Sequence, residues 1–197
     1  LKNKKKNYYF IFKRIIKILN KIQLIKDKKI INFKNKLYKV QEYRHQILFD
    51  EAKLFCDWYI PKTLPKIKGI KFNKKFKLEI KNLLLKLNFK NDTFVHRDFH
   101  ISNLIYHNKR IALIDSQDAL IGNKAYDLAS LIDDVRLKTT NKFKEKVFKF
   151  YIETNKQIDL EKFKNDFEIL SILRNFKIIG IFMRLALRDK KRNYLKL

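Results

Sequence analysis

The chain has 197 residues, of which 46% are hydrophobic and 14% aromatic, so it can bury a core and is too apolar to be disordered. Its 47 Lys and Arg residues outnumber 20 Asp and Glu residues, and the net charge of +27 would favour association with polyanions. The excess is mostly lysine, spread along the chain without an arginine stripe, so we expect no specific nucleic-acid binding.

Apolar residues at helical spacing predict a helix over residues 8–24, followed by a lysine-rich linker over residues 25–39 that is partly strand. Residues 1–40 are therefore expected to be a basic helical lead-in. A second helix is predicted over residues 41–59, and it should stop at Pro61, because proline interrupts helical hydrogen bonding.

The middle of the chain predicts a loop framed by Pro61 and Pro65, and then a third helix that is capped by Asn73 and reaches Leu87. A short apolar strand is predicted over residues 93–96. Residues 104–106 and 111–114 predict a hairpin around an Asn-Lys turn.

Three further helices are predicted over residues 125–136, 142–156 and 160–187. We expect one domain over residues 1–197. The single cysteine, Cys56, excludes an internal disulfide. Neither a secretory signal nor an apolar run of membrane-spanning length is recognised, so we expect a cytoplasmic protein without membrane contact.

Residues 96–103 read His-Arg-Asp-Phe-His-Ile-Ser-Asn, and a further acid, Asp115, follows the predicted hairpin. Phosphoryl transfer needs a carboxylate near the acceptor hydroxyl, for which Asp98 is the candidate base. It also needs magnesium held by hard oxygen ligands, which the amide of Asn103 and the carboxylate of Asp115 can supply. The strand, loop and hairpin should bring these three residues to one edge, where we expect the catalytic cleft.

Two other interpretations of these residues are weaker. An isolated Asp or Asn most often serves as a turn or cap residue, but here the whole spacing fits one chemistry. His96 and His100 have the spacing of a helical zinc motif, yet Arg97 stands where a glutamate is required and the segment is not helical, so we expect no zinc site.

These motifs resemble the aminoglycoside phosphotransferase and choline kinase superfamily, and most closely the bacterial kinases that phosphorylate N-acetylmuramate and N-acetylglucosamine at the anomeric position. The stretches that carry the resemblance are residues 96–103, 114–119, Gly122 and 125–131, with 50–59 and 173–186 supporting the narrower match. The resemblance implies an α+β, mostly helical fold: a protein-kinase-like C-terminal lobe with a small catalytic β-hairpin, and the N-terminal lobe absent.

The resemblance also implies ATP and Mg²⁺ as cofactors and a small-molecule hydroxyl acceptor. The expected acceptor is an amino sugar of cell-wall recycling, with choline or an aminoglycoside as alternatives.

By position, the resemblance makes Asp98 the catalytic base and Asn103 and Asp115 the Mg²⁺ ligands. His96 is expected to order this cofactor-binding loop, and Asp127 to brace it from the start of a helix. Ser116 departs from the family, which usually has Phe at this position. The change removes an apolar anchor beneath the metal loop.

The elements that bind the ATP phosphates in such a kinase are not recognisable in this sequence. The three glycines, at positions 69, 122 and 180, are too far apart to form a glycine-rich loop, and no ATP-binding lysine can be assigned. We therefore expect a fragment, or a chain that works with a separate small lobe or partner chain. The alternative is a non-catalytic kinase-like module or a basic nucleic-acid-associated protein.

Overall fold

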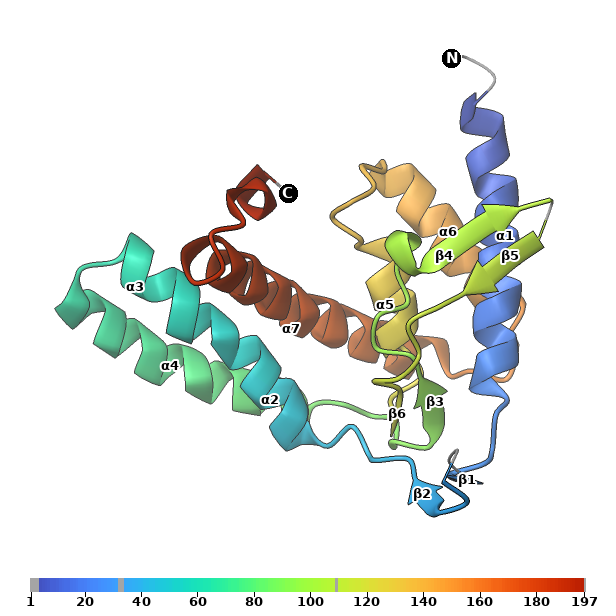
Figure 1. Ribbon diagram of the computed structural model, residues 1–197, viewed down its shortest axis with the longest axis horizontal. Helices are drawn as coiled ribbons and strands as arrows, with labels where there is room; N and C mark the ends of the chain where they lie inside the picture. Colours follow the sequence, from blue (N-terminus) through green and yellow to red (C-terminus); the bar gives the residue numbers. More distant parts are fainter. Residues whose placement is uncertain (1–3, 32–33, 109, 197) are drawn as a thin grey trace. The chain divides into compact units, whose positions relative to one another are not determined.

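The computed structural model describes residues 4–31, 34–108 and 110–196 (Figure 1). The described chain is mostly helical with small antiparallel sheets, which confirms the expected α+β class. It forms two compact units: unit 1 comprises Leu1–Tyr43 and Phe89–Phe167, and unit 2 comprises Arg44–Asn88 and Glu168–Leu197. A single domain over residues 1–197 stays a prediction.

Unit 1 is built around the predicted first helix, which is observed as α1 (Lys4–Gln23). Its apolar face is buried in the core of the unit, with Phe12, Ile15, Ile16 and Leu19 all at most 3% exposed. The same unit contains α5 (Tyr126–Ile132), α6 (Asn141–Glu153) and the first residues of α7 (Leu160–Leu187). The segment expected as a lead-in thus supplies core residues to this unit.

Among the residues that the structure describes, unit 1 also contains three short antiparallel strand pairs. They are β1 (Lys29–Ile31) with β2 (Leu37–Lys39), β3 (Thr93–Val95) with β6 (Leu120–Gly122), and β4 (Leu104–His107) with β5 (Arg110–Leu113). The first pair confirms a partly extended linker, and the third confirms the predicted hairpin. Strand β6 was not predicted, because three buried residues are too few to show an alternating pattern.

Unit 2 corrects the prediction that the second helix stops at Pro61. Helix α2 (His45–Leu54) continues into a π-helical turn (Phe55–Tyr59) and then α3 (Ile60–Thr63), which contains Pro61. In the π-helical turn the Ile60 N–H bonds the Phe55 carbonyl, five residues back. This wider turn accommodates a residue without an N–H, so the helical path continues through the proline.

Unit 2 also corrects the predicted cap at Asn73 and the loop between the two prolines. Helix α4 (Lys66–Leu85) begins directly after Pro65, whose extended backbone supplies the helix start. Asn73 lies in the middle of α4, where its side-chain amide donates to the Cys56 carbonyl at 3.4 Å. A tertiary contact therefore accounts for an asparagine that the local pattern assigned to a cap.

The interior of unit 2 is aromatic and closely packed. Phe55 lies against rings from α4 and α7, with centroid separations of 5.3 Å to Phe76 and 5.1 Å to Phe176. Cys56 is buried as a free thiol, and burial raises its pKa to about 11. A thiol in this environment is a packing residue and not a nucleophile.

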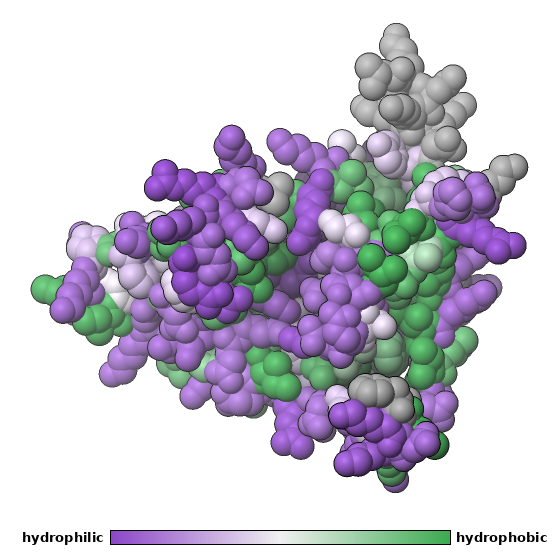
Figure 2. Space-filling model, viewed as in Figure 1, coloured by the Kyte–Doolittle hydropathy of each residue, from purple (hydrophilic) through white to green (hydrophobic). Residues whose placement is uncertain are grey.

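The visible surface is largely hydrophilic. Figure 2 shows hydrophilic side chains over much of the visible face of each unit, interrupted by smaller apolar areas. Across the ranges that the structure describes, no helix combines the length and the apolar character that crossing a bilayer requires.

Candidate active site

The candidate loop begins where β3 ends, and Asp127 holds its backbone. The Asp127 carboxylate, fully buried in the first turn of α5, accepts hydrogen bonds from the backbone N–H groups of His96 at 2.7 Å and Arg97 at 3.1 Å. Arg97 has a φ of 71°, a conformation that is unfavourable for a residue with a side chain. The two hydrogen bonds to a charged acceptor offset that cost and define the turn that leads to Asp98.

Asn103 brings the three predicted catalytic residues together. Its side-chain amide donates to the backbone carbonyl of Asp98 at 3.0 Å and to a carboxylate oxygen of Asp115 at 3.4 Å. Asn103 itself is 8% exposed, whereas Asp98 is half-buried and Asp115 exposed. A buried amide thus connects the residue that could act as a base to the acid that could hold a metal.

The backbone around Asp115 is fixed by the hairpin and by a neighbouring side chain. The Ile114 N–H donates to the Asn103 carbonyl at 3.0 Å, and Asp115 follows with a φ of 69°. The Gln117 amide donates to the other Asp115 oxygen at 2.6 Å. Ser116 is exposed, so its side chain is no apolar anchor for this loop, and Asp115 is held by polar contacts.

His96 lies beneath the loop and connects its two halves. The ring is fully buried, and its Nε2 is 3.0 Å from the Ile114 carbonyl, directly before Asp115. Burial lowers the pKa of the imidazole, although the hydrogen bond to Ile114 opposes this effect. A neutral ring with Nε2 protonated fits the contact. The ring has no exposed surface, so it offers no atom for direct contact with a cofactor, and the loop-ordering role expected for His96 stays a prediction.

The donor set suits a hard cation. Asn103 carries an amide oxygen and Asp115 a carboxylate, and their side chains approach within 3.4 Å. Within the described ranges, no group of three His, Cys, Asp or Glu residues could hold a metal ion. Mg²⁺ does not require one, since it is commonly bound by one or two protein oxygens together with phosphates and water.

Sequence reasoning missed a second carboxylate at the loop. Asp134, two residues beyond the end of α5, accepts a hydrogen bond from the Ile101 N–H at 2.9 Å. The helix predicted to reach Arg136 ends at Ile132, because this segment turns so that Asp134 can bond Ile101 and Arg136. An acid in a polar turn carries no sequence signal for such a contact.

A buried network holds the start of α5, and it was also missed. Asp166 is fully buried and accepts from the Phe89 N–H at 2.9 Å and from the Asn123 amide at 2.7 Å. The oxygen of Asn123 in turn accepts from the Ala125 N–H at 3.0 Å. Through these bonds unit 1 fixes the helix that carries Asp127.

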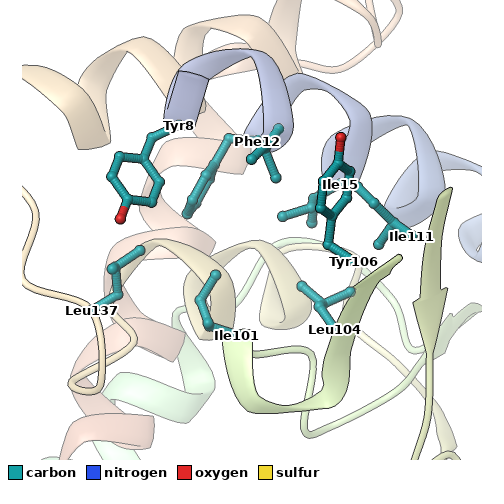
Figure 3. A pocket seen from close by; sticks show the side chains of 9 residues that line it. Tyr8, Phe12, Ile15, Ile101, Leu104, Tyr106, Ile111 and Leu137 are labelled. Carbon is teal, nitrogen blue, oxygen red and sulfur yellow. The ribbon is translucent and has the colours of Figure 1, made fainter. Parts of the chain in front are cut away.

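An apolar cavity of about 170 Å³ lies between α1 and the β4–β5 hairpin (Figure 3). Side chains of α1 line one side of it, and residues of the loop, of the hairpin and Leu137 line the other.

The hairpin also carries an exposed apolar pair. Ile105 and Ala112 lie opposite each other on the two strands, and both are exposed, Ile105 by 48%.

Comparison with known proteins identifies the class that this geometry suggests. Residues 11–162 match the model of the phosphotransferase enzyme family (APH). The match includes the whole candidate site and most of the chain, and the protein belongs to this family.

The chain is also similar to several bacterial proteins that are named as kinases. The chain is 31% identical to the N-acetylmuramate/N-acetylglucosamine kinase of Neisseria meningitidis over 78% of its own length and 48% of that protein. It is 25% identical to the kinase of the same name from Caulobacter vibrioides, over 84% of its length and 47% of that protein. For the Pseudomonas aeruginosa kinase the identity is 29%, over 78% and 47%. The chain thus spans about half the length of the relatives it matches.

Proposed function

We propose that this chain carries the base and the metal ligands of an ATP-dependent phosphotransferase that acts on a hydroxyl group of a small molecule. The observation that supports this most directly is the Asn103 amide, which bonds both the Asp98 backbone and the Asp115 side chain. One residue thereby couples the position of the base to the position of the metal ligand, as transfer between a bound nucleotide and an acceptor requires.

In this proposal Asp98 accepts a hydrogen bond from the acceptor hydroxyl and orients its oxygen toward the γ-phosphorus of ATP. As the new P–O bond forms, Asp98 takes the hydroxyl proton, the bond between the γ-phosphorus and the oxygen bridging the β- and γ-phosphates breaks, and ADP leaves with that oxygen. Asn103 and Asp115 hold Mg²⁺, which when bound neutralises charge on the nucleotide phosphates. Asp127 and His96 keep the loop in shape and do not touch the reacting atoms. Exposed Ile105, two positions after Asn103, offers an apolar surface against which a nucleotide base could pack.

The acceptor that we propose is an amino sugar. This choice is supported by the names of the relatives, which are kinases for N-acetylmuramate and N-acetylglucosamine. Choline and aminoglycosides are the alternative acceptors within the superfamily.

The phosphate-binding elements are proposed to lie in another segment or in a partner chain. The three glycines of this sequence are too dispersed to form a phosphate loop. The test of the proposal therefore separates nucleotide binding from turnover.

Titration calorimetry of the chain with ATP, with and without Mg²⁺, tests nucleotide binding. We expect Mg²⁺-dependent binding that is lost in Asp115→Ala. Asp118→Ala is the matched control, since it removes the same charge from the same loop but keeps the backbone carbonyl that accepts from Arg97 at 3.2 Å. Equal binding by wild type and Asp115→Ala would remove the metal role of Asp115.

Product formation is then assayed with N-acetylmuramate, N-acetylglucosamine, choline and an aminoglycoside, in the chain alone and with a complementary small-lobe segment. We expect phosphorylation of the amino sugars. Salt-sensitive binding to nucleic acid without any ATP binding would instead support the basic, non-catalytic module, which the net charge of +27 makes a concrete alternative.

A further inference from the structure

Asp134 is a buried acid whose two oxygens have different partners. Its side chain is only 1% exposed. One oxygen accepts from the Ile101 N–H at 2.9 Å, and the other accepts from the backbone N–H and the guanidinium of Arg136, both at 3.1 Å. Burial of a carboxylate is costly unless its hydrogen bonds are satisfied, so these contacts are strongly preferred over alternative arrangements.

Ile101 is the first residue of the 3₁₀ turn Ile101–Asn103, which ends at the proposed metal ligand. Its side chain lines the apolar cavity of about 170 Å³ in Figure 3, so side-chain packing does not enclose this residue on all sides. The backbone hydrogen bond to Asp134 is a contact that holds the chain at the first residue of this turn. Asn103 follows at the end of that turn, with its own N–H bonded to the His100 carbonyl at 3.0 Å.

We propose that Asp134 is a positioning residue for Asn103, and that α5 and the turn directly after it hold the candidate loop at two points. Asp127, in its first turn, holds the half that carries Asp98 by the N–H groups of His96 and Arg97. Asp134, just beyond its end, holds the half that carries Asn103 by the N–H of Ile101. The part concerning the metal rests on the proposed function, whereas the two-point attachment does not.

Amide hydrogen exchange measured by NMR on the 197-residue chain tests the attachment. In Asp134→Ala we expect the Ile101 and Asn103 amides to exchange about tenfold to a hundredfold faster, the range for loss of a hydrogen bond to a charged acceptor. The His96 and Arg97 amides should keep their protection, because Asp127 still holds them. Asp133→Ala is the matched control: it removes the adjacent acid, which pairs with Lys144 at 2.6 Å, and should leave all four amides unchanged.

Mn²⁺ serves as a probe of the proposed Mg²⁺ site. Its binding, followed by electron paramagnetic resonance, tests whether Asp134 positions Asn103 as a metal ligand. Displacing a group that orients a metal ligand typically weakens affinity by 10–100-fold, so we expect Asp134→Ala to bind Mn²⁺ about tenfold more weakly and Asp133→Ala to bind normally. Wild-type affinity in Asp134→Ala would overturn the positioning role. Equal loss of protection at all four amides, or an unchanged Ile101 amide, would overturn the two-point attachment.

Asp134→Asn keeps the test decisive if the alanine variant does not fold. The single oxygen of Asn should face Arg136, which offers two donors, leaving its NH₂ group toward Ile101. Selective loss of Ile101 protection is then expected, and retained protection contradicts the proposal. A wild-type chain that binds no Mn²⁺ would count against the proposed function alone, because the exchange pattern still decides the attachment.

Discussion

The Asp127 carboxylate accepts a 2.7 Å hydrogen bond from the backbone N–H of His96, thirty-one positions earlier in the chain. The same carboxylate bonds the next N–H, that of Arg97, at 3.1 Å. The acid is fully buried, so the charge that shapes the loop is removed from water. Folding of unit 1 and the geometry of the candidate site are consequently coupled through one side chain.

Asp127→Asn should lower the free energy of unfolding by about 3 kcal/mol, because one oxygen is replaced by an NH₂ group that faces a backbone N–H. Urea denaturation followed by circular dichroism measures this change. Asp50→Asn is the control, since Asp50 is exposed and accepts a hydrogen bond from the solvent-facing Gln46 amide at 3.0 Å, so the change should be within about 0.5 kcal/mol. A loss below about 1 kcal/mol for Asp127→Asn would show that the bonds do not hold the loop.

Asp98→Asn should lower turnover by about a hundredfold or more in an active form of the protein, because the amide cannot take the hydroxyl proton. The bond from Asn103 reaches the backbone carbonyl of Asp98 and not its side chain, so the fold and Mg²⁺-dependent ATP binding should persist. Steady-state kinetics and calorimetry on the same preparation separate the two effects. Turnover close to that of the wild type would remove Asp98 from the role of base.

Local patterns predicted most of the elements that build unit 1. The apolar stripe of α1 and the pairing of β4 with β5 depend on residues close together in the chain, and both were found where expected. Lys109 of the predicted Asn-Lys turn lies outside the described residues. Pro61 and Asn73 were misread because their structural roles depend on a π-helical turn and on a contact with the Cys56 carbonyl. Neither feature can be read from spacing alone.

The residues of the candidate site also differ in whether the sequence alone could reveal them. Asp98, Asn103 and Asp115 are recognisable as candidates because the chemistry proposed for them requires particular residue types at a particular spacing. Asp134 was not recognisable, since its importance arises from a hydrogen bond to a residue thirty-three positions earlier. Contacts between backbone groups and distant carboxylates leave no periodic trace in a single sequence.

Gly180→Ala should destabilise unit 2 strongly. A Cβ at this position of α7 would lie 2.4 Å from the Leu54 carbonyl carbon and 2.6 Å from the Phe55 nitrogen, and backbone atoms cannot move aside cheaply. Gly69→Ala in α4 is the matched control: its Cβ would meet Ile60 at an ordinary 3.4 Å, and alanine favours a helix by up to about 1 kcal/mol.

Thermal denaturation should show the melting temperatures of the two glycine variants shifting in opposite directions, down for Gly180→Ala and up for Gly69→Ala. Gly180→Ala should lose about 2 kcal/mol or more of the free energy of unfolding. Equal shifts would mean that the approach of Leu54 to Gly180 does not limit packing in unit 2.

The buried His96 ring should make stability depend on pH. Its folded pKa is lowered by burial below the usual value of 6.5, so between these two values the unfolded chain binds the proton more readily than the folded one. The stabilisation from His96 is therefore complete above pH 6.5 and declines as the pH falls toward the folded pKa, by at most about 1.4 kcal/mol per pH unit. Urea denaturation of wild type and His96→Gln at pH 7.5, 6.5 and 5.5 measures this term. Gln can still donate to the Ile114 carbonyl but does not titrate, so the stability advantage of the wild type over His96→Gln should shrink at acid pH. An advantage that stays constant across the three pH values would contradict a buried neutral imidazole at this position.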